Sequence, residues 1–157
     1  MSHITDARVR VRDLDALEQA CDRLGLELQR DKKTYAWWGR FVGDSRTYGN
    51  HTPDKMGKCD HAIRIKGDRA QNGPNGPWEI GVVRSEDGQA YELYYDQFGA
   101  AGQRLTDRIG ISANNLRREY TVASIARRAT TALAREGFTM TREAVFGDRV
   151  RLRFVKR

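Results

Sequence analysis

Apolar and polar residues alternate in several segments of the chain, which is the pattern of strands with one buried face. In residues 7–12 the apolar residues alternate with arginines, so we expect the first strand there. Alternation or runs of aromatic and β-branched residues predict further strands at 26–30, 34–42, 59–66, 78–84, 91–96, 138–146 and 149–155. The last four strands are expected to form two hairpins, because Asp87-Gly88 and Gly147-Asp148 are typical turn sequences.

The period changes to that of a helix in two places. Asp13 is a good N-cap for a first helix, and Gly25 is a typical residue for its end. A longer helix is expected to begin at Asn114 and to end at Gly137. This order of elements predicts an α+β fold with an antiparallel or mixed sheet and two helices on one face. A ferredoxin-like core with added hairpins fits the order, within a single domain spanning residues 1–157.

The length and composition agree with one folded domain. A chain of 157 residues buries roughly 70% of its unfolded surface. No segment has the apolar run of a signal peptide or a transmembrane helix, so we expect a soluble, cytoplasmic protein with no membrane partner. Cys21 and Cys59 are expected to be reduced thiols.

Charge divides the chain into two parts. Residues 101–157 carry twelve Arg and one Lys against five acidic residues, a net charge of +8. Residues 1–100 carry fifteen basic and sixteen acidic residues, a net charge of −1. The guanidinium group of arginine pairs bidentately with phosphate and carboxylate groups. The asymmetry therefore predicts an anionic partner for the C-terminal third.

An arginine stripe is expected on the long helix. At about 100° per residue, Arg117, Arg128 and Arg135 fall within about 20° of one another. The apolar residues on another side are expected to face the core, namely Val122, Ile125, Ala126, Ala129, Ala132 and Leu133. The stripe is either a solvated charged face or a binding surface, and the pattern leaves both interpretations open.

The last strand repeats this arrangement, since Arg149, Arg151 and Arg153 alternate with apolar residues that belong in a core. In a ferredoxin-like core the first strand would lie next to the last strand. The arginines of the first strand are Arg8, Arg10 and Arg12. Like charges on adjacent strands are destabilising, so such a face needs either acids from neighbouring strands or an anionic ligand. The obvious acids are Glu79, Glu92 and Asp96.

Aromatic residues are interleaved with basic ones between Lys32 and Lys58, and this pattern can stack unpaired nucleic-acid bases. Trp37 and Trp38 are the candidates for stacking. Two adjacent tryptophans on a strand place at least one side chain toward the core, so a purely structural role is the alternative.

Metal-binding and catalytic patterns are weak. His51, Cys59 and His61 are residue types that bind zinc, but Cys59 and His61 share an otherwise apolar face, which favours a buried thiol and a satisfied histidine. A metal-dependent hydrolase would need those residues, or Asp60, Glu79 and Asp96, to converge. No nucleophile elbow, phosphate-binding loop or dinucleotide fingerprint is present in the sequence. We therefore predict no catalytic residues, no metal and no cofactor.

Several short segments together are similar to one known family. They are Met1–Thr5, Asp13–Leu17, Leu24-Gly25, Trp38-Gly39, Ala62–Ile65, Glu79–Arg84, Asp87-Gly88, Tyr91–Leu93, Asp96, Leu116–Tyr120 and Gly137-Phe138. In order and spacing the chain resembles the hypothetical chloroplast reading frame thirty-five family of algal plastids, cyanobacteria and phages. The resemblance implies a small protein of unassigned biochemistry, in some genomes associated with an AAA-type ATPase. It implies no site residues, and residues 43–58 and 97–113 are longer than the family's usual loops.

Two functional hypotheses follow. The first is a non-enzymatic basic module that binds an anionic partner, above all nucleic acid, through the arginines of the last strand and the long helix. The second is an adaptor or accessory subunit that docks its basic part on an acidic protein such as an AAA-type ATPase. The two hypotheses share the same arginines and differ in the partner.

Overall fold

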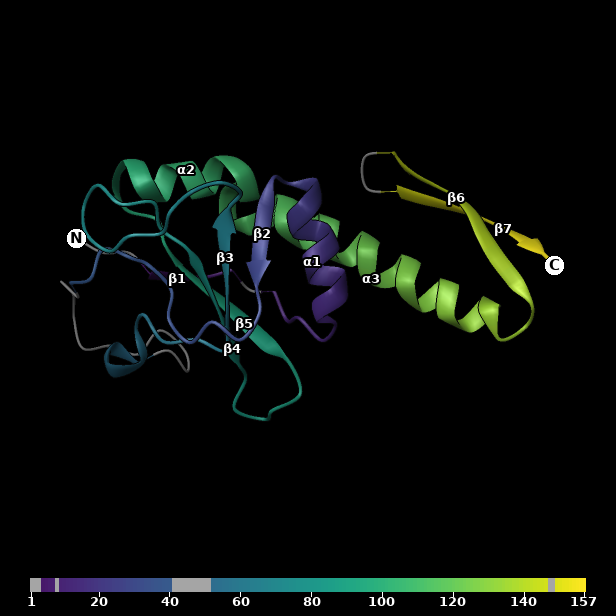
Figure 1. Ribbon diagram of the computed structural model, residues 1–157, viewed down its shortest axis with the longest axis horizontal. Helices are drawn as coiled ribbons and strands as arrows, with labels where there is room; N and C mark the ends of the chain where they lie inside the picture. The colour runs from purple at the N-terminus through teal and green to yellow at the C-terminus, as the bar shows by residue number, and fades with distance from the viewer. Residues whose placement is uncertain (1–3, 8, 41–51, 147–148) are drawn as a thin grey trace.

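An antiparallel sheet of five strands lies in one half of the molecule, and the C-terminal hairpin lies at the other end (Figure 1). Its strands are β1 (Ile4–Asp6), β2 (Leu26–Gln29), β3 (His61–Ile65), β4 (Ile80–Arg84) and β5 (Tyr91–Asp96). This computed structural model describes residues 4–7, 9–40, 52–146 and 149–157. The strand order is β1-β5-β4-β3-β2. Leu28 lies opposite Ile63, and Ile63 opposite Ile80, so apolar side chains form rows across one face.

Helices cover that face of the sheet. Among the described residues the α-helices are α1 (Leu14–Arg23), α2 (Gly99–Ile109) and α3 (Asn114–Ala134), and the short 3-10 turns are η1 (Pro53–Lys55) and η2 (Ile111–Ala113). The side chain of Asp13 caps α1 as expected, because its Oδ1 accepts hydrogen bonds from the N–H groups of Asp15 and Ala16 at 3.0 and 3.1 Å. Gly25 follows the helix with a φ of +69°, where glycine is favoured.

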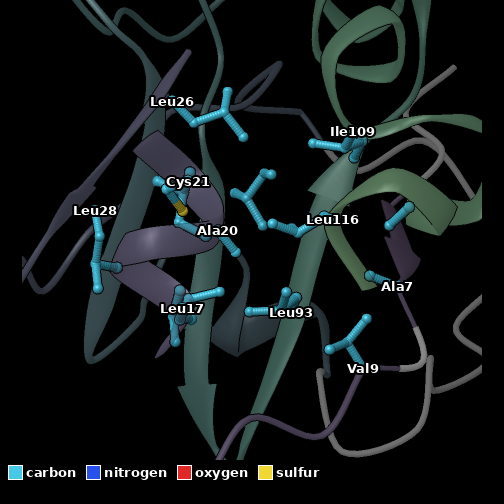
Figure 2. Packing of buried hydrophobic residues seen from close by; sticks show 14 of the residues in the cluster. Ala7, Val9, Leu17, Ala20, Cys21, Leu26, Leu28, Leu93, Ile109 and Leu116 are labelled. Carbon is cyan, nitrogen blue, oxygen red and sulfur yellow. The ribbon is translucent and has the colours of Figure 1, made fainter. Parts of the chain in front are cut away.

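The main core lies between the helices and the sheet (Figure 2). Leu17 and Cys21 of α1, Leu116 of α3 and Leu93 of β5 are all fully buried in it. The apolar residues of the segment 7–12 also enter this core, namely Ala7, Val9 and Val11. Their burial confirms the expected alternation. The strand itself lies earlier, at β1, and Val11 makes only an isolated bridge to Tyr91.

The opposite face of the sheet is covered by irregular chain rather than by helices. Tyr35, Trp37 and Met56 pack there against Ala62 and Tyr94. A side chain at Gly81 of β4 would clash, because an added Cβ would lie 2.5 Å from a ring carbon of Tyr35. Aromatic side chains therefore bury the second face, and the ring of Tyr35 can pack there only because residue 81 is a glycine.

The expected strand at 34–42 is wrong for its described part, residues 34–40. Thr34 makes one bridge to Lys58, and the rest has no regular partner strand among the described residues. Side chains bind this backbone instead. The N–H of Ala36 donates to Oε2 of Glu79 at 2.8 Å, and the N–H of Trp37 donates to Oδ1 of Asn72 at 3.1 Å. Residues 41–42 lie outside the described part of the chain.

The second sheet consists of β6 (Phe138–Phe146) and β7 (Arg149–Lys156), which pair only with each other among the described residues. The end of α3 and this hairpin extend away from the five-stranded sheet (Figure 1). We call residues 127–146 and 149–157 the C-terminal arm, and the rest of the described chain the body. Both expected hairpins are confirmed, although residues 147–148 lie outside the described part.

The expected α+β class is confirmed, and α2 adds a helix that the sequence pattern did not indicate. A ferredoxin-like core is not confirmed, because β1 pairs with β5 and β7 pairs with β6. No helix in the described residues has the length and apolarity needed to cross a membrane.

Candidate anion-binding surfaces

The hairpin separates basic and apolar residues onto two faces. Directly opposed residues of antiparallel strands point to the same side of a sheet. The register places Arg153 opposite Arg142, Arg151 opposite Ala144, and Arg149 opposite Phe146. The outer face defined by these residues is therefore basic, and Arg142 joins the three arginines found from the sequence.

The inner face of the hairpin packs against α3. Oγ1 of Thr130 lies 3.6 Å from Sδ of Met140. Glu143 forms an ion pair with Arg23 at the end of α1, which ties the hairpin to the body. The apolar residues of the last strand are only half-buried, namely Val150, Leu152 and Phe154. The expectation that they join a core is thus met only in part, because the hairpin packs on a helix and not in the main sheet.

The outer face carries positive charge without compensation. A cavity of about 220 Å³ is lined by Arg142, Ala144, Phe146, Arg151 and Arg153. The guanidinium carbon of Arg151 lies 5.6 Å from the centre of the Phe146 ring, and Phe146 is 58% exposed. Among the described residues no carboxylate forms an ion pair with the outer-face arginines.

The acids expected to neutralise these arginines have other partners. Glu79 is buried and forms an ion pair with Lys32, while Glu92 accepts a hydrogen bond from the hydroxyl of Tyr94. Asp96 is buried and accepts from the N–H of Phe98 at 3.0 Å. Neutralisation by these acids is therefore excluded, because their strands belong to a sheet that β7 does not join.

The arginine stripe on α3 forms a second basic surface. Arg117, Arg128 and Arg135 are exposed, as expected. Arg117 donates to the side chain of Asn114, and Arg128 lines a groove beside residues 10–13. Thr130, which contacts the hairpin, is about 200° around the helix from Arg128. The stripe and the outer face of the hairpin therefore lie on different sides of α3.

The core face of α3 is rotated from the one that its apolar pattern predicts. Val122 and Ala126 are buried as expected, but Ile125 and Ala132 are exposed. Leu116, Tyr120 and Ala123 are buried in their place. The second half of the helix buries little, because it extends beyond the sheet that it would need to cover.

The structure brings Arg10 and Arg12 to α3 and not to the last strand. Both line the groove that contains Arg128, and Arg10 also forms an ion pair with Asp87 at 2.8 Å. Arg8 lies outside the described residues. The expected row of arginines on neighbouring first and last strands does not exist, because β7 pairs with β6.

The two tryptophans have structural contacts. Trp37 is buried on the second face of the sheet. The ring of Trp38 stacks on Phe98, with centroids 5.1 Å apart and planes inclined by 16°. The contacts of Trp37 and Trp38 favour the structural interpretation over base stacking.

The candidate metal ligands do not form a cluster of three in the part of the chain that the structure describes, and His51 lies outside it. Cys21 and Cys59 are free thiols, and burial raises the pKa of Cys59 to about 12. Nδ1 of His61 accepts a hydrogen bond from the N–H of Asp31 at 2.8 Å, and burial lowers the pKa of His61. Asp60 accepts from the N–H of Arg84 at 2.8 Å. Asp60 and Nδ1 of His61 thus have structural contacts, whereas Nε2 of His61 is buried without a hydrogen-bond partner among the described residues.

No protein-family model, curated protein or solved structure matches this chain. The resemblance to the reading frame thirty-five family therefore stays a prediction. The functional argument rests on the two basic surfaces.

Proposed function

We propose that this protein binds nucleic acid through the outer face of its C-terminal hairpin. The observation that carries the proposal is the shared face of Arg142, Arg149, Arg151 and Arg153, on which no carboxylate of the described residues lies within ion-pair distance. A protein that needs such arginines only for solubility has no reason to gather them on one face of one hairpin.

The spacing of these arginines suits a phosphate backbone. Alternate residues on a strand lie about 6.7 Å apart, so Arg149, Arg151 and Arg153 form a regular row of guanidinium groups. Arg142 and Arg153 oppose each other directly, which is unfavourable unless an anion lies between or above them. Phosphate groups would relieve that repulsion and release counterions, so affinity should fall steeply with salt.

Phe146 supplies a feature that favours nucleic acid over a simple anion. It lies at the end of β6, is mostly exposed and shares the face of the arginines. Exposed aromatic residues beside basic ones stack on unpaired bases, and apolar side chains can wedge between base steps. A two-stranded ribbon also fits the major groove of a duplex.

An acidic protein surface is the alternative partner, as in an adaptor for an AAA-type ATPase. Val155 is 49% exposed on the same face as Phe146, and arginine and aromatic residues are common in protein interfaces. This alternative predicts binding to an acidic protein in the absence of nucleic acid.

The proposal is tested by fluorescence anisotropy with labelled single-stranded and duplex oligonucleotides at about 50 mM salt. We expect micromolar or weaker affinity for the wild-type chain. The variant R149S/R151S/R153S should bind at least about tenfold more weakly, since three phosphate contacts are lost. The matched control K66S/R69S/R108S removes the same charge from exposed positions of the body and should change affinity much less.

Two outcomes would overturn the proposal. Absence of oligonucleotide binding at low salt would do so. Binding of polyglutamate by the wild-type chain, and its loss in the hairpin variant, would then support the adaptor hypothesis. Equal weakening by the hairpin variant and the body control would show that net charge, and not the hairpin face, attracts the oligonucleotide.

A further inference from the structure

A groove separates the segment 10–13 from α3, on the side of the helix away from the hairpin. Its cavity has a volume of about 550 Å³. Arg12 and Arg128 line it from opposite walls, and Ser124 and Thr121 add hydroxyl groups from α3. Concave sites of this size hold small molecules, whereas the cavity on the outer face of the hairpin is smaller, at about 220 Å³.

The walls of the groove are held together by specific contacts. The hydroxyl oxygen of Tyr120, a buried residue of α3, accepts hydrogen bonds from the N–H groups of Arg12 and Asp13 at 2.8 and 3.3 Å. Arg127 binds Asp13 at 2.9 Å and Asp15 at 2.7 Å. The distance between the walls is therefore fixed by the fold.

The groove is electrostatically positive. No carboxylate of the described residues forms an ion pair with Arg12 or Arg128. Asp13 is the acid in the wall, and its carboxylate already binds Arg127 and two N–H groups. Tyr120 accepts two hydrogen bonds, which leaves its own hydroxyl proton as a donor.

A second cavity of about 350 Å³ continues this surface along α3. It shares Asp13 and Arg128 with the groove, and adds Thr131 and Arg135. Arg128 thus lies between two adjoining depressions, each with a further arginine and a hydroxyl group. A single phosphate would contact one depression, while two linked phosphates would reach both sides of Arg128.

We propose that this groove binds a small molecule with a diphosphate or longer phosphate chain, held by Arg12, Arg128 and Arg135. Arginine forks pair bidentately with phosphate oxygens, and the hydroxyl groups of Ser124 and Thr131 complete the donor set. The site is independent of the nucleic-acid surface, because it lies on a different side of α3 and shares no arginine with the hairpin.

Isothermal titration calorimetry with inorganic pyrophosphate tests this site, with inorganic phosphate and sulfate as comparison anions at constant ionic strength. We expect saturable binding of pyrophosphate to one site, weaker binding of phosphate and weaker still of sulfate. Arg128→Ser should weaken pyrophosphate binding by about tenfold or more, as expected for the loss of charged hydrogen bonds. Circular dichroism would verify that this exposed substitution leaves the fold intact.

The hairpin variant R149S/R151S/R153S is the matched control, and it should bind pyrophosphate as the wild-type chain does. Equal binding by Arg128→Ser and wild type would overturn the proposal. Equal loss in the hairpin variant would also overturn it, because the anion would then follow net charge. Arg128→Ser should change the affinity for oligonucleotides little. Failure of the pyrophosphate site can therefore be distinguished from failure of the proposed function.

Discussion

The body and the C-terminal arm use arginine in different ways. In the body, Arg30 pairs with Asp15 and Glu18, Arg64 with Glu27, and Arg104 with Asp68. On the outer face of the arm no ion pair forms among the described residues, although arginines are denser there. These arginines of the body thus stabilise contacts within the chain, and Arg142, Arg149, Arg151 and Arg153 of the hairpin keep their hydrogen-bond donors for another molecule.

The two regions also differ in how they are held together. The body has a core of fully buried side chains between three helices and the sheet. The hairpin has half-buried apolar residues and one helix beneath it. Two-stranded hairpins are marginally stable alone, so the arm depends on α3 and on the Arg23–Glu143 ion pair.

Truncating matched leucines should give the largest contrast. Leu93→Ala removes a fully buried side chain from the centre of the sheet and should lower the free energy of unfolding by about 2–5 kcal/mol. Leu152→Ala in the half-buried face of the hairpin should cost about 1 kcal/mol or less. Urea denaturation of both variants measures the difference. Similar losses would mean that the hairpin belongs to the same cooperative core.

Removal of arginines should affect stability in one region only. R30S/R64S/R104S breaks ion pairs in the body and should cost about 1–2 kcal/mol in total, since exposed pairs contribute little each. R149S/R151S/R153S should change stability by less than about 1 kcal/mol at low salt, because relief of the repulsion between Arg153 and Arg142 offsets loss of the Arg151–Phe146 contact. Thermal denaturation at two salt concentrations checks both expectations. A destabilised hairpin variant would indicate intramolecular roles for these arginines.

Weakening the Arg23–Glu143 ion pair, which links the body to the hairpin, should loosen the hairpin without destabilising the whole fold. Glu143→Gln removes the charge that binds Arg23 and should cost about 0.5–1 kcal/mol, because both side chains are partly exposed. Hydrogen exchange should become faster in β6 and β7 and stay unchanged in β3 and β4. Arg104→Ser is a suitable control, since it breaks an exposed pair with Asp68 that shares no residue with the Arg23–Glu143 pair. Unchanged exchange in the hairpin would show that α3 alone holds it.

The smallest expected effect is a pH dependence that belongs to the body. Burial lowers the pKa of His61, so the folded state binds fewer protons than the unfolded chain below pH about 6.5. Stability should therefore be complete above that pH, fall as the pH drops through it, and level off below the folded pKa. His61→Gln should flatten this slope in urea titrations between about pH 5 and 7. An equal slope in the variant would assign the effect to other groups.

The sequence pattern predicted the elements whose signals are local. The turn at Asp87-Gly88 and the cap at Asp13 each specify a structure within a few residues, and both hairpins and α1 are where they were expected. The segment 34–40 was predicted as a strand because its aromatic residues are typical of strands, but Tyr35, Ala36 and Trp37 are all buried without a regular partner strand. Its backbone is bound by Glu79 and Asn72, and residue type carries no information on such distant partners.

The same limit applies to the candidate sites: local patterns identified the arginines but not the elements that they meet. The arginine stripe and the row on the last strand were predictable, and pairing across the Gly147-Asp148 turn would also have indicated Arg142. Alternation shows that a strand has one buried face, but not which element buries it, so the hairpin was placed in the wrong sheet. The meeting of Arg12 with Arg128 depends on the contact between Tyr120 and residues 12–13, over 100 positions apart in the chain.

The pairing of β1 with β5 also sets the order in which the chain can fold during synthesis. Ile4 pairs with Asp96, so the first strand has no partner until the fifth has been made. At about 5–20 residues per second, that interval is roughly 5–20 s. During it, Ile4, Ala7, Val9 and Val11 have no sheet to enter. The growing chain therefore exposes an apolar N-terminal segment for several seconds. A chaperone that binds nascent chains can bind this segment during that interval.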